Sequence, residues 1–496
     1  MRSLPRRTAP TAVVKIAIVF VGICAAFAPY PSLASDDWVT YAHDDRRTGF
    51  QPSPTGISRS TVGTLRLQWS VALRETVTSS PIVSGGTAFV ATERGNVYAL
   101  RTGDGHVRWR RNVGNSVRMT PVLAHDRLLI GVYGMYGTPT RRASGASLQA
   151  LDPASGRVLW KTPLPGVVRS EPVVVAGVIY EGIAGGDAES GCESGRIVTL
   201  DERTGKRLAG VWYTSTKPRN GGGIWAPLSF DGATIFFGTG NTCDGTGAQD
   251  AVVAISPELK TRWATPARSP NGEDEDVGGG AMIRGELVYV EGKSGLLYAL
   301  DRQTGSTKWT ADVHADSPGG GGFATPAGDG TVLVVNSGDS SSQPPQHTKL
   351  VAFDGAGRER YAIDQHTVST PGLGASFVPG VGFAGIDKTI VAFDAQSGAT
   401  LWTYETADAF YAVPAIVSSG VYAVDLSGNV YAFGRGAAGN ASATTKQTTV
   451  EHGDRGVVVE RRVFEHRRAI EVGAPFGLAI AVAAGLYLFG RRRRRP

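Results

Sequence analysis

The chain has 496 residues with 66 glycines, 41% hydrophobic and 19% charged residues. It is too apolar for a disordered protein, and abundant glycine with little charge favours tight turns over long solvated helices. The formal net charge of +6 comes from the ends, because four basic residues in 1–34 and five arginines at 491–495 leave −3 for the rest. We therefore expect an all-β protein without a nucleic-acid partner.

The first 34 residues have the three parts of a secretory signal peptide. A basic start precedes an apolar run from Ala17 to Ala28, and Ser32-Leu33-Ala34 provides a small-residue cleavage site. This pattern predicts export and removal of residues 1–34.

The C-terminal end predicts a single membrane span. Residues 472–490 form an uncharged apolar stretch, and at about 1.5 Å per residue a helix of this length just crosses a bilayer core. The arginine-rich tail 491–496 is then cytoplasmic, because positive charge stays on that side. We expect anchoring to the cytoplasmic membrane with the bulk of the chain outside, or a cell-surface location if this tail is a sorting signal that is removed.

A recurring phrase between the ends predicts the fold. Alternating apolar residues run into Asp-x-x-Thr/Ser-Gly, and an aromatic residue, in most cases a tryptophan, ends the next strand. The aspartate and glycine suit a tight turn between two strands. The aromatic positions recur at spacings near those of four-stranded propeller blades, at Trp69, Trp109, Trp160, Trp212, Trp263, Trp309, Tyr361 and Trp402. We expect each ring to pack against the next blade.

The orphan strand near Trp69 complements the last repeat, which has a strand within 412–434 but no tryptophan after it. Pairing the two would close the ring and remove open sheet edges. We therefore predict an eight-bladed β-propeller over 65–434, preceded by a segment at 35–64 that wraps one face and followed by a flexible, charged stalk at 435–471.

The repeats and the opening Trp38…Tyr41-Ala-His-Asp together resemble the pyrroloquinoline quinone (PQQ) dehydrogenase family, over nearly all of 38–434. The match is closest to the polyvinyl-alcohol dehydrogenase branch. Because related outer-membrane assembly lipoproteins use the same blades without a cofactor, the function depends on the site.

Three segments outside the repeated phrase resemble the family's site, in the family's order. Gly221-Gly-Gly-Ile-Trp225 and Gly238-Thr-Gly-Asn241 resemble the segment with the quinone floor and a calcium-binding asparagine. Asp274-Glu-Asp276 resembles the segment that ends in the catalytic base, and Gly292-Lys293 the segment whose lysine touches the quinone. The resemblance implies that Asp276 accepts the alcohol proton while hydride moves to PQQ polarised by Ca²⁺.

The same resemblance implies a calcium site, with Asn241, Asp276 and one glutamate supplying oxygen ligands. Both Glu189 and Glu193 fit the family's motif with a small insertion, and Glu189 is the preferred ligand. Two cysteines remain after removal of the signal peptide, Cys192 and Cys243. In an oxidising compartment we expect them to form a disulfide, which would join the two loops proposed to hold calcium.

The sequence departs from the family in three places. It has no Cys-x-x-Cys-His for covalent haem, no adjacent cysteine pair, and Glu275 in place of an aromatic residue. Electrons would therefore leave to a separate acceptor such as a cytochrome c. Two functions remain open: a quinoprotein oxidising a small or polymeric alcohol, and a non-catalytic propeller that binds a protein or an envelope polymer.

Overall fold

Two compact units divide the chain, Met1–Ser32 and Leu33–Pro496, and every described residue belongs to the second. The computed structural model describes residues 36–134, 145–184, 194–215, 221–242, 250–267, 276–293, 295–313, 326–328, 332–336, 349–364, 374–436, 446–452 and 457–463. Within these ranges the fold is all-β, with one short 3₁₀ helix, η1 (Val62–Thr64), and no α-helix.

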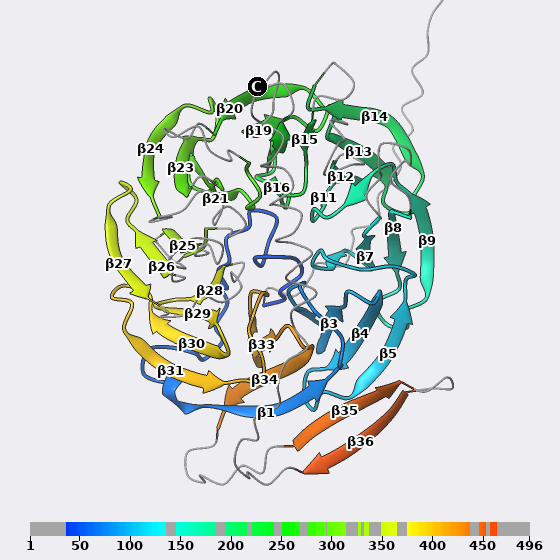
Figure 1. The fold of residues 1–496 in the computed structure, drawn as a ribbon, viewed down its shortest axis with the longest axis vertical. Helices are drawn as coiled ribbons and strands as arrows, with labels where there is room; N and C mark the ends of the chain where they lie inside the picture. Colours follow the sequence, from blue (N-terminus) through cyan, green and yellow to red (C-terminus); the bar gives the residue numbers. More distant parts are fainter. Residues whose placement is uncertain are drawn as a thin grey trace, which may run out of the picture. The chain divides into compact units, whose positions relative to one another are not determined.

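Antiparallel sheets follow one another around a ring (Figure 1). The first sheet contains β2 (Ile82–Ser84), β3 (Thr87–Ala91), β4 (Asn96–Arg101) and β5 (Val107–Asn112). The second contains β6 (Val122–Ala124), β7 (Arg127–Val132), β8 (Ser147–Leu151) and β9 (Val158–Pro163). The third contains β10 (Val167–Val168), β11 (Val173–Val175), β12 (Val178–Ala184), β13 (Arg196–Asp201) and β14 (Arg207–Tyr213). In the third sheet, β10 and β11 pair with the same strand, β12.

The ring continues with four more sheets. The fourth sheet contains β16 (Ser229–Phe230), β17 (Ile235–Gly238), β19 (Ala251–Ile255) and β20 (Thr261–Pro266), and the fifth contains β21 (Met282–Arg284), β22 (Leu287–Glu291), β23 (Leu296–Asp301) and β24 (Thr307–Asp312). The sixth contains β25 (Val332–Asn336), β26 (Lys349–Phe353) and β27 (Glu359–Asp364). The seventh contains β28 (Ala375–Val378), β29 (Val381–Ile386), β30 (Thr389–Asp394) and β31 (Thr400–Glu405).

Both ends of the repeat region build the closing sheet. Its strands are β32 (Ala415–Val417), β33 (Gly420–Val424), β34 (Asn429–Arg435), β1 (Leu65–Ala72), β35 (Lys446–His452) and β36 (Val457–Val463). β1 pairs antiparallel with β34, from Leu65 opposite Arg435 to Ala72 opposite Asn429. The predicted closure by terminal strands is therefore confirmed. The hairpin β35–β36, which lies in the expected stalk, pairs with β1 in parallel.

The predicted count of eight complete blades is corrected to seven for the described residues. Seven sheets have at least four strands, whereas β25–β27 form a sheet of three. Between β24 and β25 the chain is described only at 313 and 326–328, and these residues contain no innermost strand for that sheet.

No helix in the described part of the chain is long and apolar enough to cross a membrane. The predicted signal peptide, the span 472–490 and the tail 491–496 lie outside the described residues.

The repeated tryptophans join neighbouring blades, as the sequence predicts. Trp109 Nε1 donates to Pro153 O at 2.9 Å, and Trp160 Nε1 donates to Glu202 O at 2.9 Å. A Cβ on Gly205 would lie 2.4 Å from Trp160, so glycine in the turn lets the ring approach. Each such contact buries a large ring and satisfies its one donor.

Residues 36–51, which we call the axial strap, cross the centre of the ring (Figure 1). Their backbone bonds to the innermost strands of several blades: Trp38 to Val83, Val39 to Leu123, Asp45 to Phe230, Arg46 to Ile283, and Gly49 and Gln51 to Phe377. The strap therefore links blades that are distant in sequence.

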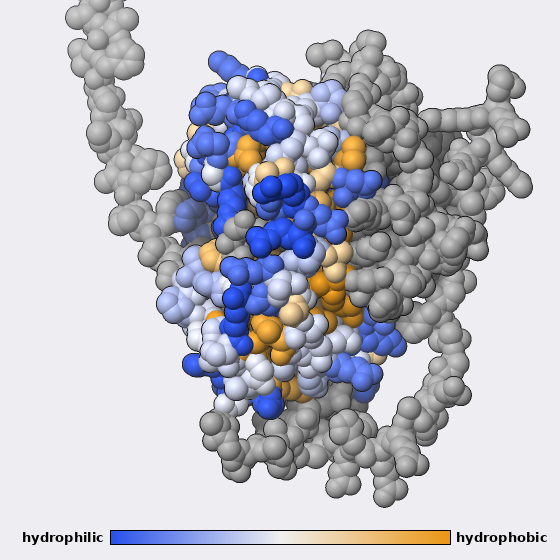
Figure 2. Space-filling view, turned by 90° about the vertical axis from the view of Figure 1, so that its left-hand side faces the viewer, coloured by the Kyte–Doolittle hydropathy of each residue, from blue (hydrophilic) through white to orange (hydrophobic). Residues whose placement is uncertain are grey.

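One side of the ring is mostly polar (Figure 2). Figure 2 shows the side that carries β24, β27 and β31, where hydrophilic residues surround small hydrophobic areas. Exposed and half-buried positions alternate along the last residues of β24 and β31. Outermost strands of this kind face water on one side.

Candidate functional site

Trp225 lies in the turn that leads into the blade of β16–β20. Two short strands frame this turn, β15 (Gly221–Gly223) and β18 (Gly240–Thr242), with Gly223 opposite Gly240. The Trp225 ring packs against a small apolar cluster of Tyr133, Val167 and Ala184. Its Nε1 is buried and has no hydrogen-bond partner among the described residues.

Asp276 opens the segment that leads into β21 and is 4% exposed. The next residue is fixed by a bond from Val277 N to Thr239 O at 3.1 Å. Lys293 lies in the turn between β22 and β23, and its backbone N donates to Asp276 O at 2.8 Å. Lys293 follows Asp276 by 17 residues in the sequence. The fold of the blade brings its turn back to the segment that leads into β21, the innermost strand of the same blade.

The side chains of these residues meet. Lys293 Nζ lies 2.5 Å from Asp276 Oδ2 and 5.7 Å from the centroid of the Trp225 ring, over its face. The structure therefore brings together an aromatic face, a buried carboxylate and an ammonium group, all three at positions predicted from the sequence. An ammonium over an indole face is attracted by the ring as well as by the carboxylate.

Gly240 makes this approach possible, and sequence reasoning gave it no role. A Cβ at this position would lie 2.6 Å from Asp276 Oδ1 and 2.8 Å from Trp225 Cζ2. The signal was present in the quoted Gly-Thr-Gly-Asn241 segment, because glycine in a strand often marks a close approach.

Glu181 is a second residue that sequence reasoning missed. It lies in the apolar strand β12, and Oε1 accepts a hydrogen bond from Ser170 Oγ at 2.9 Å. Burial raises the pKa of Glu181 well above its ordinary value. Its neighbour Gly182 leaves room for Ile224, since a Cβ there would lie 2.6 Å from Ile224 Cγ2. Glu181 thus lies directly before a glycine that packs against Ile224, the residue preceding Trp225. An ionisable residue inside an apolar strand was the available signal.

The remaining predicted site residues are described in part or not at all. Asn241 has its backbone in β18, beside β15, but its side chain is outside the described part. Glu189, Glu193, Cys192 and Cys243 lie outside the described residues. The calcium ligands therefore stay a prediction.

The fold is thus a propeller of blades joined through tryptophans, with an indole, a carboxylate and an ammonium group in contact. The family model described as outer membrane protein assembly factor BamB, a model of the PQQ repeat, matches residues 61–311, 193–377 and 293–461. The chain belongs to this family of PQQ-repeat propellers.

The chain is also similar to characterised dehydrogenases. A polyvinylalcohol dehydrogenase of Sphingopyxis sp. (strain 113P3) is 27% identical over 458 residues, covering 75% of this chain and 67% of the relative. The crystal structure of a quinohemoprotein alcohol dehydrogenase from Comamonas testosteroni superposes with a TM-score of 0.68 at 19% identity, over 82% of each chain. BamB from Moraxella catarrhalis gives 0.55 at 17% identity, over 75% of this chain and 99% of that chain. The two structural matches support the fold.

Proposed function

We propose that this protein is an extracytoplasmic quinoprotein dehydrogenase that oxidises an alcohol, with Asp276 as the base. The contact among Trp225, Asp276 and Lys293 carries the proposal. The similarity to polyvinylalcohol dehydrogenase supports a small or polymeric alcohol as the substrate class.

The residues present fit a planar, polycarboxylated quinone. Trp225 offers a broad aromatic face, and Lys293 supplies a cation over that face, 5.7 Å from its centroid. An acidic aromatic ligand is attracted by both features. When bound, PQQ would supply the two-electron acceptor, and Ca²⁺ would polarise its reacting carbonyl.

Asp276 is suited to hold and accept a proton. It is buried, and the bond from Lys293 Nζ to Oδ2 orients the carboxyl group. Oδ1 faces Gly240, where a side chain would clash with it. We assign to Asp276 the removal of the hydroxyl proton from the substrate, a role that needs a positioned carboxylate shielded from bulk water.

The predicted calcium and disulfide sites would lie beside this group. A Cβ on Gly195 would approach Gly222 O at 2.0 Å, and Thr242 pairs with Gly221. The described flanks of the segments that contain Glu189, Cys192 and Cys243 therefore both border β15. This supports a disulfide Cys192–Cys243, with Glu189 and Asn241 as calcium ligands together with Asp276. We further propose export, anchoring through 472–490, and electron transfer to a separate acceptor such as a cytochrome c.

A second candidate function is a non-catalytic scaffold that binds a protein or an envelope polymer. The matching family model, which is described as BamB, and the superposition on BamB favour this scaffold function.

One titration separates the two functions. The purified mature chain is titrated with PQQ, with and without Ca²⁺, while tryptophan fluorescence and dye reduction with a panel of alcohols are measured. Saturable, calcium-dependent quenching that is lost in Trp225→Phe supports the quinoprotein. The absence of quenching at any calcium concentration overturns it in favour of the scaffold.

A further inference from the structure

Arg47 of the axial strap is a buried cation outside the site described above. Its side chain is 0% exposed, and its backbone adopts a left-handed conformation with a φ of 56°. For a residue other than glycine this conformation costs free energy, and it persists only where the surrounding structure enforces it. Burial also lowers the pKa of the guanidinium, and the nearby carboxylates Asp45 and Glu171 oppose that shift.

The Arg47 guanidinium bonds to the base of the Trp225 turn. Nε donates to Leu228 O at 2.8 Å, three residues after Trp225, and Nη2 donates to Pro172 O at 3.3 Å. Leu228 N in turn donates to Glu171 O at 3.0 Å. One guanidinium therefore ties the turn to the start of β11 in the preceding blade.

The remaining guanidinium nitrogen, Nη1, bonds to residues of the strap itself. It donates to Thr40 Oγ1 at 2.6 Å and to Tyr41 O at 3.2 Å. A planar guanidinium can make these bonds in several directions at once, which an ammonium cannot.

The two residues before Arg47 bond to both strands that follow the site segments. Phe230 N donates to Asp45 O at 2.7 Å, and Ile283 N donates to Arg46 O at 2.8 Å. These strands, β16 and β21, come directly after the segments with Trp225 and Asp276. Ser229 Oγ also donates to Ala281 O at 2.5 Å, which joins the two segments themselves.

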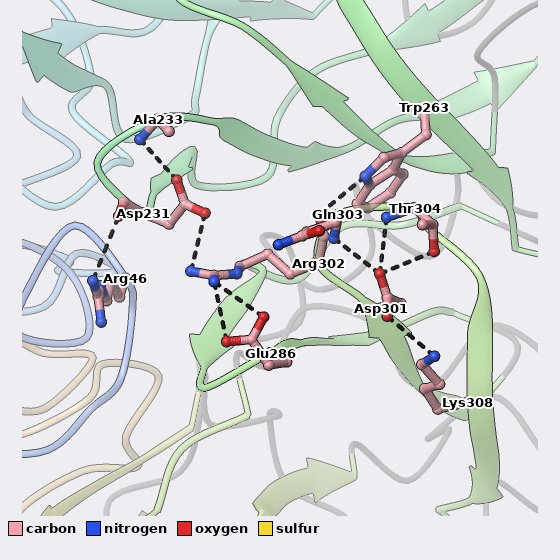
Figure 3. Close-up of polar contacts among 10 residues, drawn as sticks. All are labelled: Arg46, Asp231, Ala233, Trp263, Glu286, Asp301, Arg302, Gln303, Thr304 and Lys308. Carbon is pink, nitrogen blue, oxygen red and sulfur yellow. Dashed lines mark hydrogen bonds and ion pairs between the residues drawn. The ribbon is translucent and has the colours of Figure 1, made fainter.

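Side chains beyond the strap continue this link between the same two blades (Figure 3). Arg46 Nη2 donates to Asp231 O at 3.5 Å, and the Asp231 carboxylate pairs with Arg302 Nη1 at 3.3 Å. Arg302 also pairs with Glu286, and its carbonyl accepts a bond from Trp263 Nε1 at 3.1 Å. The blades of β16–β20 and β21–β24 are thus fixed to each other and to the strap.

We propose that Arg47 is a positioning residue, which sets the Trp225 ring against Asp276 by holding the Leu228 carbonyl beneath the Trp225 turn. The strap thereby orients the site from within the ring, through its contacts with the protein. The chemistry of the site rests on the proposed function, whereas the role of Arg47 in orienting Trp225 does not.

The test is fluorine NMR of the full mature chain labelled with 5-fluorotryptophan, without added cofactor. The Trp225 resonance is assigned by its loss in Trp225→Phe. We expect Arg47→Met to shift or broaden this resonance while the resonances of the seven interblade tryptophans stay in place. The matched control is Arg59→Met, which removes an arginine 46% exposed that pairs with Asp394 in another blade, and it should leave the Trp225 resonance unchanged.

An unchanged Trp225 resonance in folded Arg47→Met overturns the inference. If Arg47→Met does not fold, Arg47→Lys decides in its place, because lysine keeps the charge but not the three-way bonding. A shifted Trp225 resonance then supports the inference, and an unchanged one rejects it.

A PQQ titration keeps the two proposals apart. If the unsubstituted chain binds PQQ, we expect Arg47→Met to weaken the affinity about tenfold, which is about 1.4 kcal/mol. If the unsubstituted chain does not bind PQQ, the proposed function fails, and the NMR comparison still decides the role of Arg47.

Discussion

Lys293 and Asp276 are bonded to each other twice. The ammonium group lies 2.5 Å from Asp276 Oδ2, and the backbone N of Lys293 donates to Asp276 O at 2.8 Å. The two side chains are 15% and 6% exposed, so neither charge is well hydrated. The pair therefore locks the turn between β22 and β23 onto the segment that begins the same blade.

Removing one partner of this buried pair should be strongly destabilising. Lys293→Met leaves a buried carboxylate without its ammonium, and we expect the free energy of unfolding to fall by about 3–5 kcal/mol. Adding Asp276→Asn also removes the buried carboxylate charge, so the double variant should recover much of the lost stability. Urea unfolding of the wild type, the two single variants and the double variant measures the coupling.

The matched control is Lys308→Met in the same blade. Lys308 is 48% exposed and lies 3.1 Å from Asp301. Figure 3 shows this pair. Solvent-exposed pairs contribute about 1 kcal/mol or less, so this variant should lose far less stability. Equal losses for Lys293→Met and Lys308→Met would contradict a special buried pair.

Asp276→Asn should separate binding from chemistry. Asparagine keeps the size of the side chain but cannot accept the substrate proton, so we expect dye reduction to fall by about 10²–10⁴-fold. Because Asp276 is also a proposed calcium ligand, the affinity for PQQ is measured by fluorescence quenching at saturating Ca²⁺, where it should fall far less than turnover. Asp301→Asn at the end of β23 in the same blade is the control, with activity near wild type. Undiminished turnover in Asp276→Asn would reject the base assignment.

Gly240→Ala should disturb the contact between the indole and the carboxylate. The added methyl group would lie 2.6 Å from Asp276 Oδ1 and 2.8 Å from Trp225, so one of them has to move. We expect a loss of about 1–3 kcal/mol in stability, together with a changed Trp225 fluorescence. Gly103→Ala is the control, because a Cβ there has no neighbour within 4 Å. Equal stability in both variants would show that the site tolerates the added methyl group.

Local repetition explains why much of the fold could be predicted. Where the phrase has its aspartate, that side chain caps the backbone of the turn, as when Asp152 Oδ1 accepts from Ala154 N at 2.8 Å. The aromatic residue after the turn then contacts the next blade, so a phrase of about a dozen residues encodes both the hairpin and the interface. Trp225, Asp276 and Lys293 could be located because each lies in a recognisable segment beside such a hairpin.

A segment before the ring was predicted, but the blades to which the strap bonds could not be, because its bonds carry no local pattern. Arg47 reaches Pro172 across 125 positions, and Gln51 Nε2 donates to Ile416 O across 365. Backbone donors and acceptors are the same for every sequence, so nothing in residues 36–51 indicates which blades they bond. The count of complete blades failed for a related reason, since a repeat marks the outer strands of a blade and not its innermost strand.

Glu181→Gln should make stability less dependent on pH. Because the folded-state pKa of Glu181 is raised well above the ordinary value of 4.5 by burial, the folded state holds the proton more tightly than the unfolded state. The stabilisation is complete below pH 4.5 and is lost as pH rises through the folded-state pKa. Glutamine never ionises, so it avoids this loss.

We therefore expect the stability of Glu181→Gln relative to the wild type to increase between pH 4 and pH 8, by about 1.4 kcal/mol for each unit by which the pKa is raised. Urea unfolding at pH 4, 6 and 8 measures this, and a constant offset would reflect only the changed hydrogen bonding to Ser170. Glu286→Gln is the control, because this carboxylate is 73% exposed and stays hydrated on folding. If the two variants have the same pH dependence, Glu181 is not the buried neutral carboxyl group that its place in β12 indicates.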